Sequence, residues 1–207
     1  MNKRYTLFLF FTLCTLQLMA QTNRIGLRDS RYLQYTHIFA RHFPVTLDHS
    51  LYSDNIKMQH CRLLAGYQHQ VALKADNQFR FNYSLYYGGL YNGAFQDYGL
   101  KIDAEFHCPA IRCIFMGTFN PHYDTQLYFS TCYSIGLQFR MNSTVSLFAQ
   151  STNIPEYRQP QDRVKAGFSI HVLSSSSRSL VVQPHASIPV NQPYQNTRLH
   201  VDFAYHF

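Results

Sequence analysis

Apolar and polar residues alternate with a period of two along much of the chain, and the pattern is clearest at its end. In residues 197–207 apolar or aromatic side chains occupy every second position, with mostly polar ones between them. Successive side chains of a β-strand point to opposite faces, so this segment predicts a strand with one apolar and one polar face. Similar rows begin near Phe79, Tyr98, Leu127 and Val164. Weaker rows occupy residues 61–73, 111–119, 145–149 and 180–188.

No long segment of residues 21–207 has a helical period, and none approaches the roughly 20 apolar residues that a membrane-spanning helix needs. Repeated alternating strands of about ten residues are typical of transmembrane β-barrels. A closed barrel is also the only sheet that satisfies its backbone in lipid. The pattern therefore predicts an all-β protein, an antiparallel up-and-down transmembrane β-barrel of about ten strands. Twelve strands follow if residues 24–27 also pair, and eight if one of the stronger rows is not a strand.

The connections between these strands alternate between short and long. Short ones are expected at residues 74–78, 108–111, 140–143 and 174–178, and longer ones at 91–97, 120–125, 153–162 and 189–196. Outer-membrane barrels have short periplasmic turns and longer outside loops. Counting back from a last strand that ends in the periplasm places every long connection outside.

The least certain register lies in residues 31–52, where two strand-like pieces flank Phe43 and Pro44. Two separate strands there give an odd total of eleven. An even number follows if Pro44, which cannot donate a ladder hydrogen bond, lies at a bulge or at the start of the first strand.

Composition agrees with a wall that faces lipid. The chain has 207 residues, with 16 Tyr, 17 Phe and no Trp, and its charged fraction of 14% is below the roughly 25% of soluble domains. Its mean hydropathy is −0.25, so apolar residues are spread out rather than bunched. The net charge of +7 comes without the basic runs of nucleic-acid binders, so nucleic acid is not expected as a partner.

The amino terminus has the features of a secretory signal. Lys3 and Arg4 precede an apolar core from Leu7 to Leu18, and Ala20 offers a small residue before Gln21. We expect residues 1–20 to be removed as a signal peptide, residues 21–30 to form an N-terminal extension and residues 31–207 to form the barrel.

These features together resemble a small outer-membrane β-barrel protein of the Bacteroidota type. The resemblance rests on the signal ending Leu-Met-Ala-Gln, on the alternating strands and on the terminal Tyr-His-Phe. It implies export through the signal peptide to the bacterial outer membrane, with outer-membrane lipid and the barrel-assembly machinery as partners. Phe203, Tyr205 and Phe207 are then the insertion signal.

Four cysteines lie beyond the signal peptide: Cys61, Cys108, Cys113 and Cys132. Alternation places Cys61 and Cys113 on the lipid face and Cys132 on the lumen face. Cys108 and Cys113 alone are close enough, around one turn, to form a disulfide in an oxidising envelope. Unpaired thiols are the simpler expectation.

Charged residues of the polar face predict a cluster inside the barrel. Arg80, Glu105 and Arg112 are expected from three consecutive strands near the periplasmic end, with Lys101 and Asp103 continuing the row. A lone buried charge is costly, so these groups are expected to pair. They form either a constriction that selects small solutes or a salt-bridged plug, and we expect the plug.

A second inward group contains histidines and a carboxylate from the last three strands. Its members are His171, His185, His200, Asp202 and His206. His with carboxylate can bind a transition metal or carry protons, but no strand holds a dense ligand motif. We therefore expect histidines that fill the lumen, with no metal and no cofactor.

Catalytic residues are not expected. His122 and Asp124 share a predicted outer loop without a second dyad, and His49 on the lipid face is followed at the same face by Leu51 rather than Ser. The outer loop around residues 153–163 offers Tyr157 and Arg158 as contacts for an envelope or extracellular partner.

The sequence thus predicts a non-enzymatic outer-membrane barrel with a largely filled lumen that acts structurally or through its outer loops. A narrow porin-like channel for ions or very small solutes is the alternative, followed by an outer-leaflet lipid-modifying enzyme. A soluble β-sandwich or lipocalin-like barrel is the rival fold, in which the aromatic rows would point inward.

Overall fold

The computed structural model describes residues 22–29, 32–51, 59–125, 128–154, 162–175, 178–191 and 197–207. The expected signal peptide, and the loop contact candidates Tyr157 and Arg158, lie outside these residues. Within this part of the chain no helix is long and apolar enough to cross a membrane.

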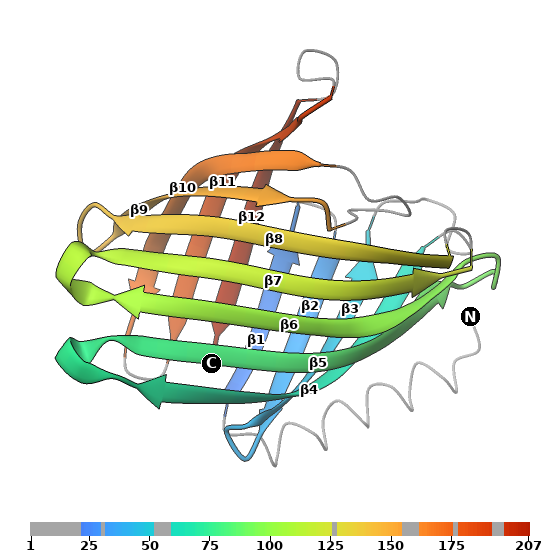
Figure 1. Cartoon of the computed structure of the whole chain (residues 1–207), viewed down its shortest axis with the longest axis horizontal. Coiled ribbons are helices and arrows are strands. Elements are labelled where there is room, and N and C mark those ends of the chain that lie inside the picture. Colours follow the sequence, from blue (N-terminus) through green and yellow to red (C-terminus); the bar gives the residue numbers. More distant parts are fainter. Residues whose placement is uncertain are drawn as a thin grey trace.

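In the part of the chain that the structure describes, twelve antiparallel strands form one closed barrel (Figure 1). Each strand pairs with its neighbours in sequence, and β1 pairs with β12. The strands are β1 (Thr22–Arg28), β2 (Tyr32–Phe39), β3 (Phe43–Ser50), β4 (His60–Ala72), β5 (Gln78–Leu90), β6 (Gln96–Cys108), β7 (Cys113–Asp124), β8 (Tyr128–Arg140), β9 (Val145–Thr152), β10 (Arg163–Ser174), β11 (Ser179–Pro189) and β12 (Arg198–His206). Two short 3-10 turns, η2 (Lys74–Asp76) and η3 (Pro109–Ile111), connect β4 to β5 and β6 to β7.

The predicted all-β antiparallel barrel is confirmed, with twelve strands rather than ten. Residues 22–28, expected as an N-terminal extension, form β1 and pair with both β12 and β2. Residues 31–52 hold two strands rather than one, which by itself would give an odd total of eleven. With β1 included, the total is the even number of twelve.

The turn between β2 and β3 explains why two strands were read as one. Its residues Ala40 and Arg41 have positive φ angles of 47° and 66°, and His42 donates its backbone N–H to the carbonyl of Phe39. Hairpin turns with this geometry usually contain Gly, Asn or Asp, so the Ala-Arg pair gives no turn signal. Pro44 is the second residue of β3 and pairs with Ile38, rather than starting the first strand.

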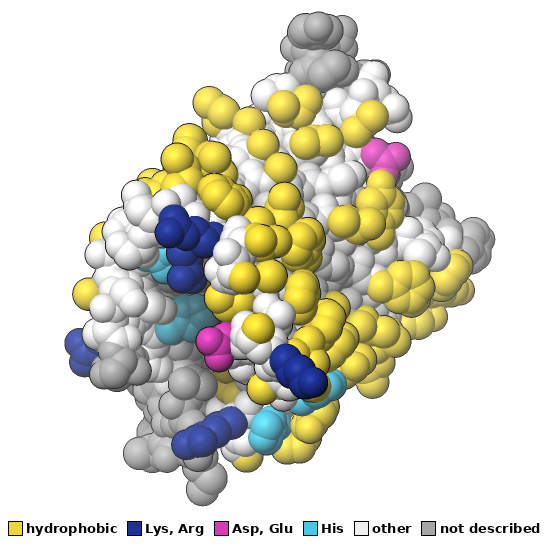
Figure 2. Space-filling view, turned by 60° about the vertical axis from the view of Figure 1, so that its left-hand side comes forward, with side chains coloured by type: hydrophobic (Ala, Val, Ile, Leu, Met, Phe, Trp, Pro, Cys, Tyr) yellow, Lys and Arg dark blue, Asp and Glu magenta, His cyan; other side chains and the backbone are white. Residues whose placement is uncertain are grey.

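Side chains alternate between an apolar exterior and a polar lumen along the strands. Leu85, Ile135 and Leu199 on the outer wall are 68%, 67% and 84% exposed. Figure 2 shows hydrophobic side chains spread over much of the visible wall. Most of the described residues that are buried carry polar side chains. Ser84 precedes Leu85 and Ser134 precedes Ile135 in the sequence, and both are buried. The molecule is therefore apolar outside and polar inside, the reverse of a soluble barrel.

The two ends of the barrel differ. The short connections of β4–β5, β6–β7, β8–β9 and β10–β11 lie at the end where Phe207 lies, which we call the turn end. We call the opposite end the loop end. The segment 120–125, expected as a connection there, instead continues β7 to Asp124.

Candidate functional site

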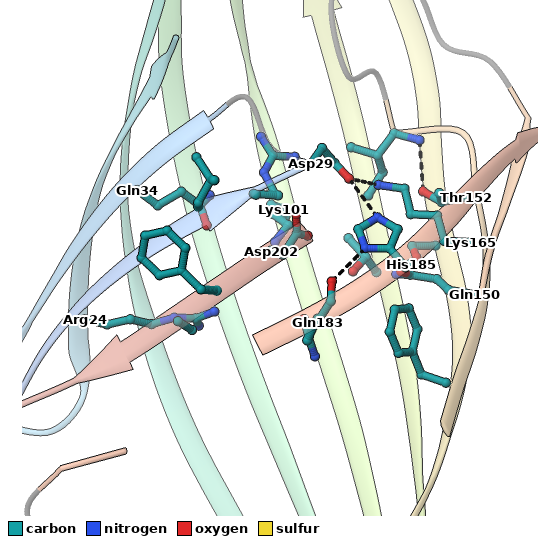
Figure 3. A pocket seen from close by; sticks show the side chains of 18 residues that line it. Arg24, Asp29, Gln34, Lys101, Gln150, Thr152, Lys165, Gln183, His185 and Asp202 are labelled. Atoms are coloured by element: carbon teal, nitrogen blue, oxygen red, sulfur yellow. Dashed lines mark hydrogen bonds and ion pairs between the residues drawn. The ribbon is translucent and has the colours of Figure 1, made fainter. Parts of the chain in front are cut away.

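The barrel encloses a cavity of about 270 Å³ in the middle of its lumen (Figure 3). Its wall comes from β1, β2 and β6–β12. Four basic side chains, two carboxylates and one histidine line it: Arg24, Arg28, Lys101, Lys165, Asp29, Asp202 and His185. The polar side chains of moderate length that line this part of the lumen leave open space between them, so the lumen is not completely filled at this depth.

Asp29 is the most buried charged residue of the cavity wall. It follows β1, has a positive φ of 54° and is 1% exposed. Its Oδ1 is ion-paired with Nζ of Lys165 and lies 3.6 Å from Nε2 of His185 (Figure 3). Its carbonyl accepts a hydrogen bond from Nδ1 of His200 at 2.8 Å. The β1–β2 connection is thus fastened to β10, β11 and β12.

Electrostatics hold this carboxylate in its ionised form. Burial by itself raises the pKa of Asp29, but His185 and the cations Lys165 and Arg28 outweigh it and lower the pKa well below its usual range. We call Asp29, Lys165, His185, His200 and Asp202 the Asp29 site.

Asp103 is the centre of the predicted charge cluster. Lys101 is ion-paired with it at 2.9 Å, and Thr118 donates a hydrogen bond of 2.7 Å to its Oδ1. Arg80 and Glu105 are cross-strand neighbours, as expected for adjacent strands, but Glu105 contacts His107 at 3.0 Å.

Arg112 departs from the expected cluster. It lies in the turn after η3 with a left-handed φ of 55°, rather than in a strand. There it lines a smaller cavity of about 110 Å³ at the turn end, together with His107 and Arg140. The five expected charges therefore divide between the middle of the lumen and its turn end.

A second polar network occupies the loop end of the lumen. Asp97 is 0% exposed, is ion-paired with Arg62 and accepts a hydrogen bond from Nε2 of His60 at 3.0 Å. The guanidinium carbon of Arg62 lies 4.7 Å from the centre of the Tyr86 ring. We call these residues, with Asn120, His122 and Asp124, the Asp97 cluster.

A chain of hydrogen bonds in the Asp97 cluster runs from Asn120 through Tyr86 to His122. Asn120 donates to the Tyr86 hydroxyl at 3.0 Å, so the hydroxyl can donate its own proton to Nδ1 of His122 at 2.7 Å. That tautomer places a proton on Nε2 of His122, which faces Oδ2 of Asp124 at 3.2 Å. The cluster provides two His–carboxylate contacts, where the sequence indicated only one.

The structure brings together only part of the predicted histidine group. The rings of His185 and His200 stack with centroids 5.3 Å apart. His185 and Asp202 both line the cavity (Figure 3). His206 and His171 lie nearer the turn end. Their register partners on the neighbouring strands are Arg24 and Val181, respectively.

Sequence reasoning missed Asp29, Arg62 and Lys165. Asp29 lay in the presumed extension, and only its place after a short alternating run could have indicated it. The alternation places the side chains of Arg62 and Lys165 on the lumen face. Their carboxylate partners could not be predicted, because that requires the pairing register between strands.

The remaining predicted residues lie on β12 and around the η3 turn, and Phe203 among them also lines the cavity. The rings of Tyr205 and Phe207 stack at 5.5 Å, and Phe203 pairs in register with Leu27 and Val182. Cys108 and Cys113 are register partners across the η3 turn, yet both are free thiols.

The fold and the lumen define the class of this protein as a closed antiparallel barrel with an apolar wall and a polar interior. No family model matches the chain, and no curated protein matches it. Among solved structures, the KdgM porin in complex with disordered oligogalacturonate has a TM-score of 0.57 at 10% identity, over 90% of this chain and 98% of that one.

Two further solved structures are longer than this chain. A substituted OccD1 (OprD) has a TM-score of 0.48 at 6% identity, over 85% of this chain and 58% of that one. Acinetobacter baumannii OccAB2 has a TM-score of 0.44 at 10% identity, over 90% and 59%. At these identities the likeness concerns the fold.

Proposed function

We propose that the protein is a narrow porin-like channel of the bacterial outer membrane that passes ions or very small polar solutes. The observation that carries this proposal is the polar cavity inside a closed barrel whose outer wall is apolar. An apolar exterior suits lipid, and a polar interior with open space suits water and solutes. The fold likeness to the KdgM porin supports the same class.

Cavity size and charge limit the solutes. Small-molecule sites in proteins usually measure about 300–1,000 Å³. The 270 Å³ of this cavity therefore favours ions and very small solutes over oligomers. Basic side chains outnumber carboxylates in its wall by four to two, and Arg24 is exposed to the open space. These features favour anions over cations of equal size.

The proposal includes the route to the membrane. Export through the signal peptide, insertion by the barrel-assembly machinery and contact with outer-membrane lipid are all parts of it. A closed barrel that acts through its outer loops remains the second candidate, because the Asp97 cluster places buried ion-paired side chains across part of the loop end.

Planar-bilayer recording of the protein purified from outer membranes tests the channel. We expect steady, ohmic single-channel steps. Thr118 lines the cavity, whereas the next residue, Phe119, is exposed on the outer wall. Thr118→Trp should therefore reduce the step size, and the matched control Phe119→Trp should leave it unchanged. Folding of each variant is checked by heat-modifiable gel mobility.

Two results would contradict the proposed channel function. One is a folded, inserted barrel that shows no current above that of lipid alone, which favours the closed barrel. The other is an equal current in the wild type and in folded Thr118→Trp, because the current then does not pass through this lumen.

A further inference from the structure

The Asp29 site contains a contact that its hydrogen bonds do not explain. Oδ1 of Asp29 and Nε2 of His185 face each other at 3.6 Å, beyond hydrogen-bond distance. Both residues are more than nine-tenths buried, with exposures of 1% and 6%. Among the described residues, neither Oδ2 of Asp29 nor Nε2 of His185 has a hydrogen-bond partner.

Backbone carbonyls set the protonation of the two stacked histidines. Nδ1 of His185 lies 3.1 Å from the carbonyl oxygen of Gln183, and Nδ1 of His200 lies 2.8 Å from that of Asp29. A carbonyl oxygen only accepts, so each Nδ1 carries the proton and donates it. In the neutral ring Nε2 is then the nitrogen with the lone pair, which is the usual state of a metal-ligating histidine held by a carbonyl.

This tautomer places two electron-pair donors against each other. A neutral His185 offers a lone pair at Nε2 toward an ionised carboxylate, and two such groups repel one another in a buried site. The contact becomes attractive when a cation lies between them, which is either a proton on His185 or a metal ion.

Asp202 completes a set of ligands for an ion. One ligand atom each from Asp29, His185 and Asp202 lie within 4.8 Å of one another. An ion held at about 2.0–2.2 Å from each atom needs them no more than about 4 Å apart, so a side-chain movement of less than about 1 Å closes the set. All three face the cavity, from which an ion and a completing water can enter (Figure 3).

We infer that Asp29, His185 and Asp202 form a binding site for one divalent first-row transition-metal ion in the lumen. One nitrogen and two carboxylate oxygens are ligands that Zn²⁺ and its neighbours accept, whereas Ca²⁺ and Mg²⁺ prefer oxygen alone. Lys165 is ion-paired with Oδ1 of Asp29, which leaves Oδ2 as the oxygen that can bind the metal ion. The Lys165 ammonium and the metal ion would then share the Asp29 carboxylate. The site does not depend on whether the barrel conducts.

The test is titration of the purified full-length barrel in detergent with Zn²⁺ followed by calorimetry, and with Co²⁺ followed by visible absorption. We expect one ion per barrel and a Co²⁺ spectrum without the charge-transfer band of thiolate ligands. Asp29→Asn, His185→Gln and Asp202→Asn should each weaken Zn²⁺ binding at least about 100-fold, because the loss of supporting residues alone costs 10–100-fold.

His171→Gln is the matched control, since it removes another lumen histidine from outside the site and should leave the Zn²⁺ affinity unchanged. Heat-modifiable mobility confirms folding, and three ligand variants keep the test valid if one fails to fold. If the wild type does not bind Zn²⁺, the inference is overturned, and the cation between His185 and Asp29 is a proton on His185. Binding that survives in a folded ligand variant also overturns it.

Discussion

Asn23 and Phe207 exchange both of their backbone hydrogen bonds, with N···O distances of 2.9 Å and 3.0 Å. This pair joins β1 to β12 at the turn end, and four register pairs from Arg24–His206 to Leu27–Phe203 continue the seam. Without this seam, β2 and β12 would present unpaired edges, which a membrane does not tolerate. Closure of the barrel therefore depends on its shortest strand.

Gly26 allows the backbone of β1 to approach the backbone of β12 closely at this seam. A Cβ at this position would lie 2.9 Å from the carbonyl oxygen of Phe203 on β12. Gly26→Val should therefore push the strands apart and destabilise the barrel by about 1–3 kcal/mol. Denaturant unfolding followed by heat-modifiable mobility measures the loss. Gly117→Val is the control, because a Cβ there meets nothing nearer than 4.0 Å; equal stability of the two variants would contradict the role of the seam.

The outer wall gives a second prediction, which separates a membrane barrel from a soluble one. Ile135 lies in the middle of β8 and is 67% exposed. In a bilayer, Ile135→Lys should cost about 2–4 kcal/mol, because the charge lies near the midplane. Unfolding of the variant from lipid vesicles measures this cost.

Met141→Lys provides the control for the outer wall. Met141 is 49% exposed but lies in the β8–β9 turn, where an added charge should cost no more than about 1 kcal/mol. A soluble barrel would tolerate both lysines equally, so equal stability of the variants would count against membrane insertion.

The alternation predicted the long strands and their faces because period two is a local property of the sequence. It placed Cys132 inside the barrel, where the structure has it fully buried. The favoured count of ten was wrong at β1–β3, because β1 has only seven residues and the Ala40–Arg41 turn lacks a typical turn residue. The alternative of twelve strands, which required residues 24–27 to pair, is confirmed.

The sites were predictable only in part, because they depend on register between strands. His185 and His200 were expected inside the barrel, and their stacking follows from their being register partners. The contact of Asp29 with Lys165 joins residues 136 positions apart. No local pattern carries that information, and Arg112 was misplaced because a left-handed turn residue interrupts the alternation.

The Asp97 cluster gives a third prediction, on stability. Arg62→Leu removes the guanidinium beside the fully buried Asp97 and leaves the contact with His60 in place. An incompletely compensated buried charge should cost about 3–5 kcal/mol. The double variant Arg62→Leu with Asp97→Asn removes the charge as well and should recover much of this loss. Denaturant unfolding of both variants provides the comparison. A single variant as stable as the wild type would show that the pair contributes nothing.

Arg24 gives the last prediction, on ion selectivity of the proposed channel. Its side chain lines the cavity and is exposed there, whereas Arg28, Lys101 and Lys165 are each ion-paired with a carboxylate. Arg24→Gln should therefore move the reversal potential in a KCl gradient toward the value for cations, because it removes a positive charge that solutes can meet. Lys74→Gln, an exposed change in the η2 turn, is the charge-matched control and should leave the potential unchanged. A reversal potential that is the same in both variants would mean that permeating ions do not pass Arg24.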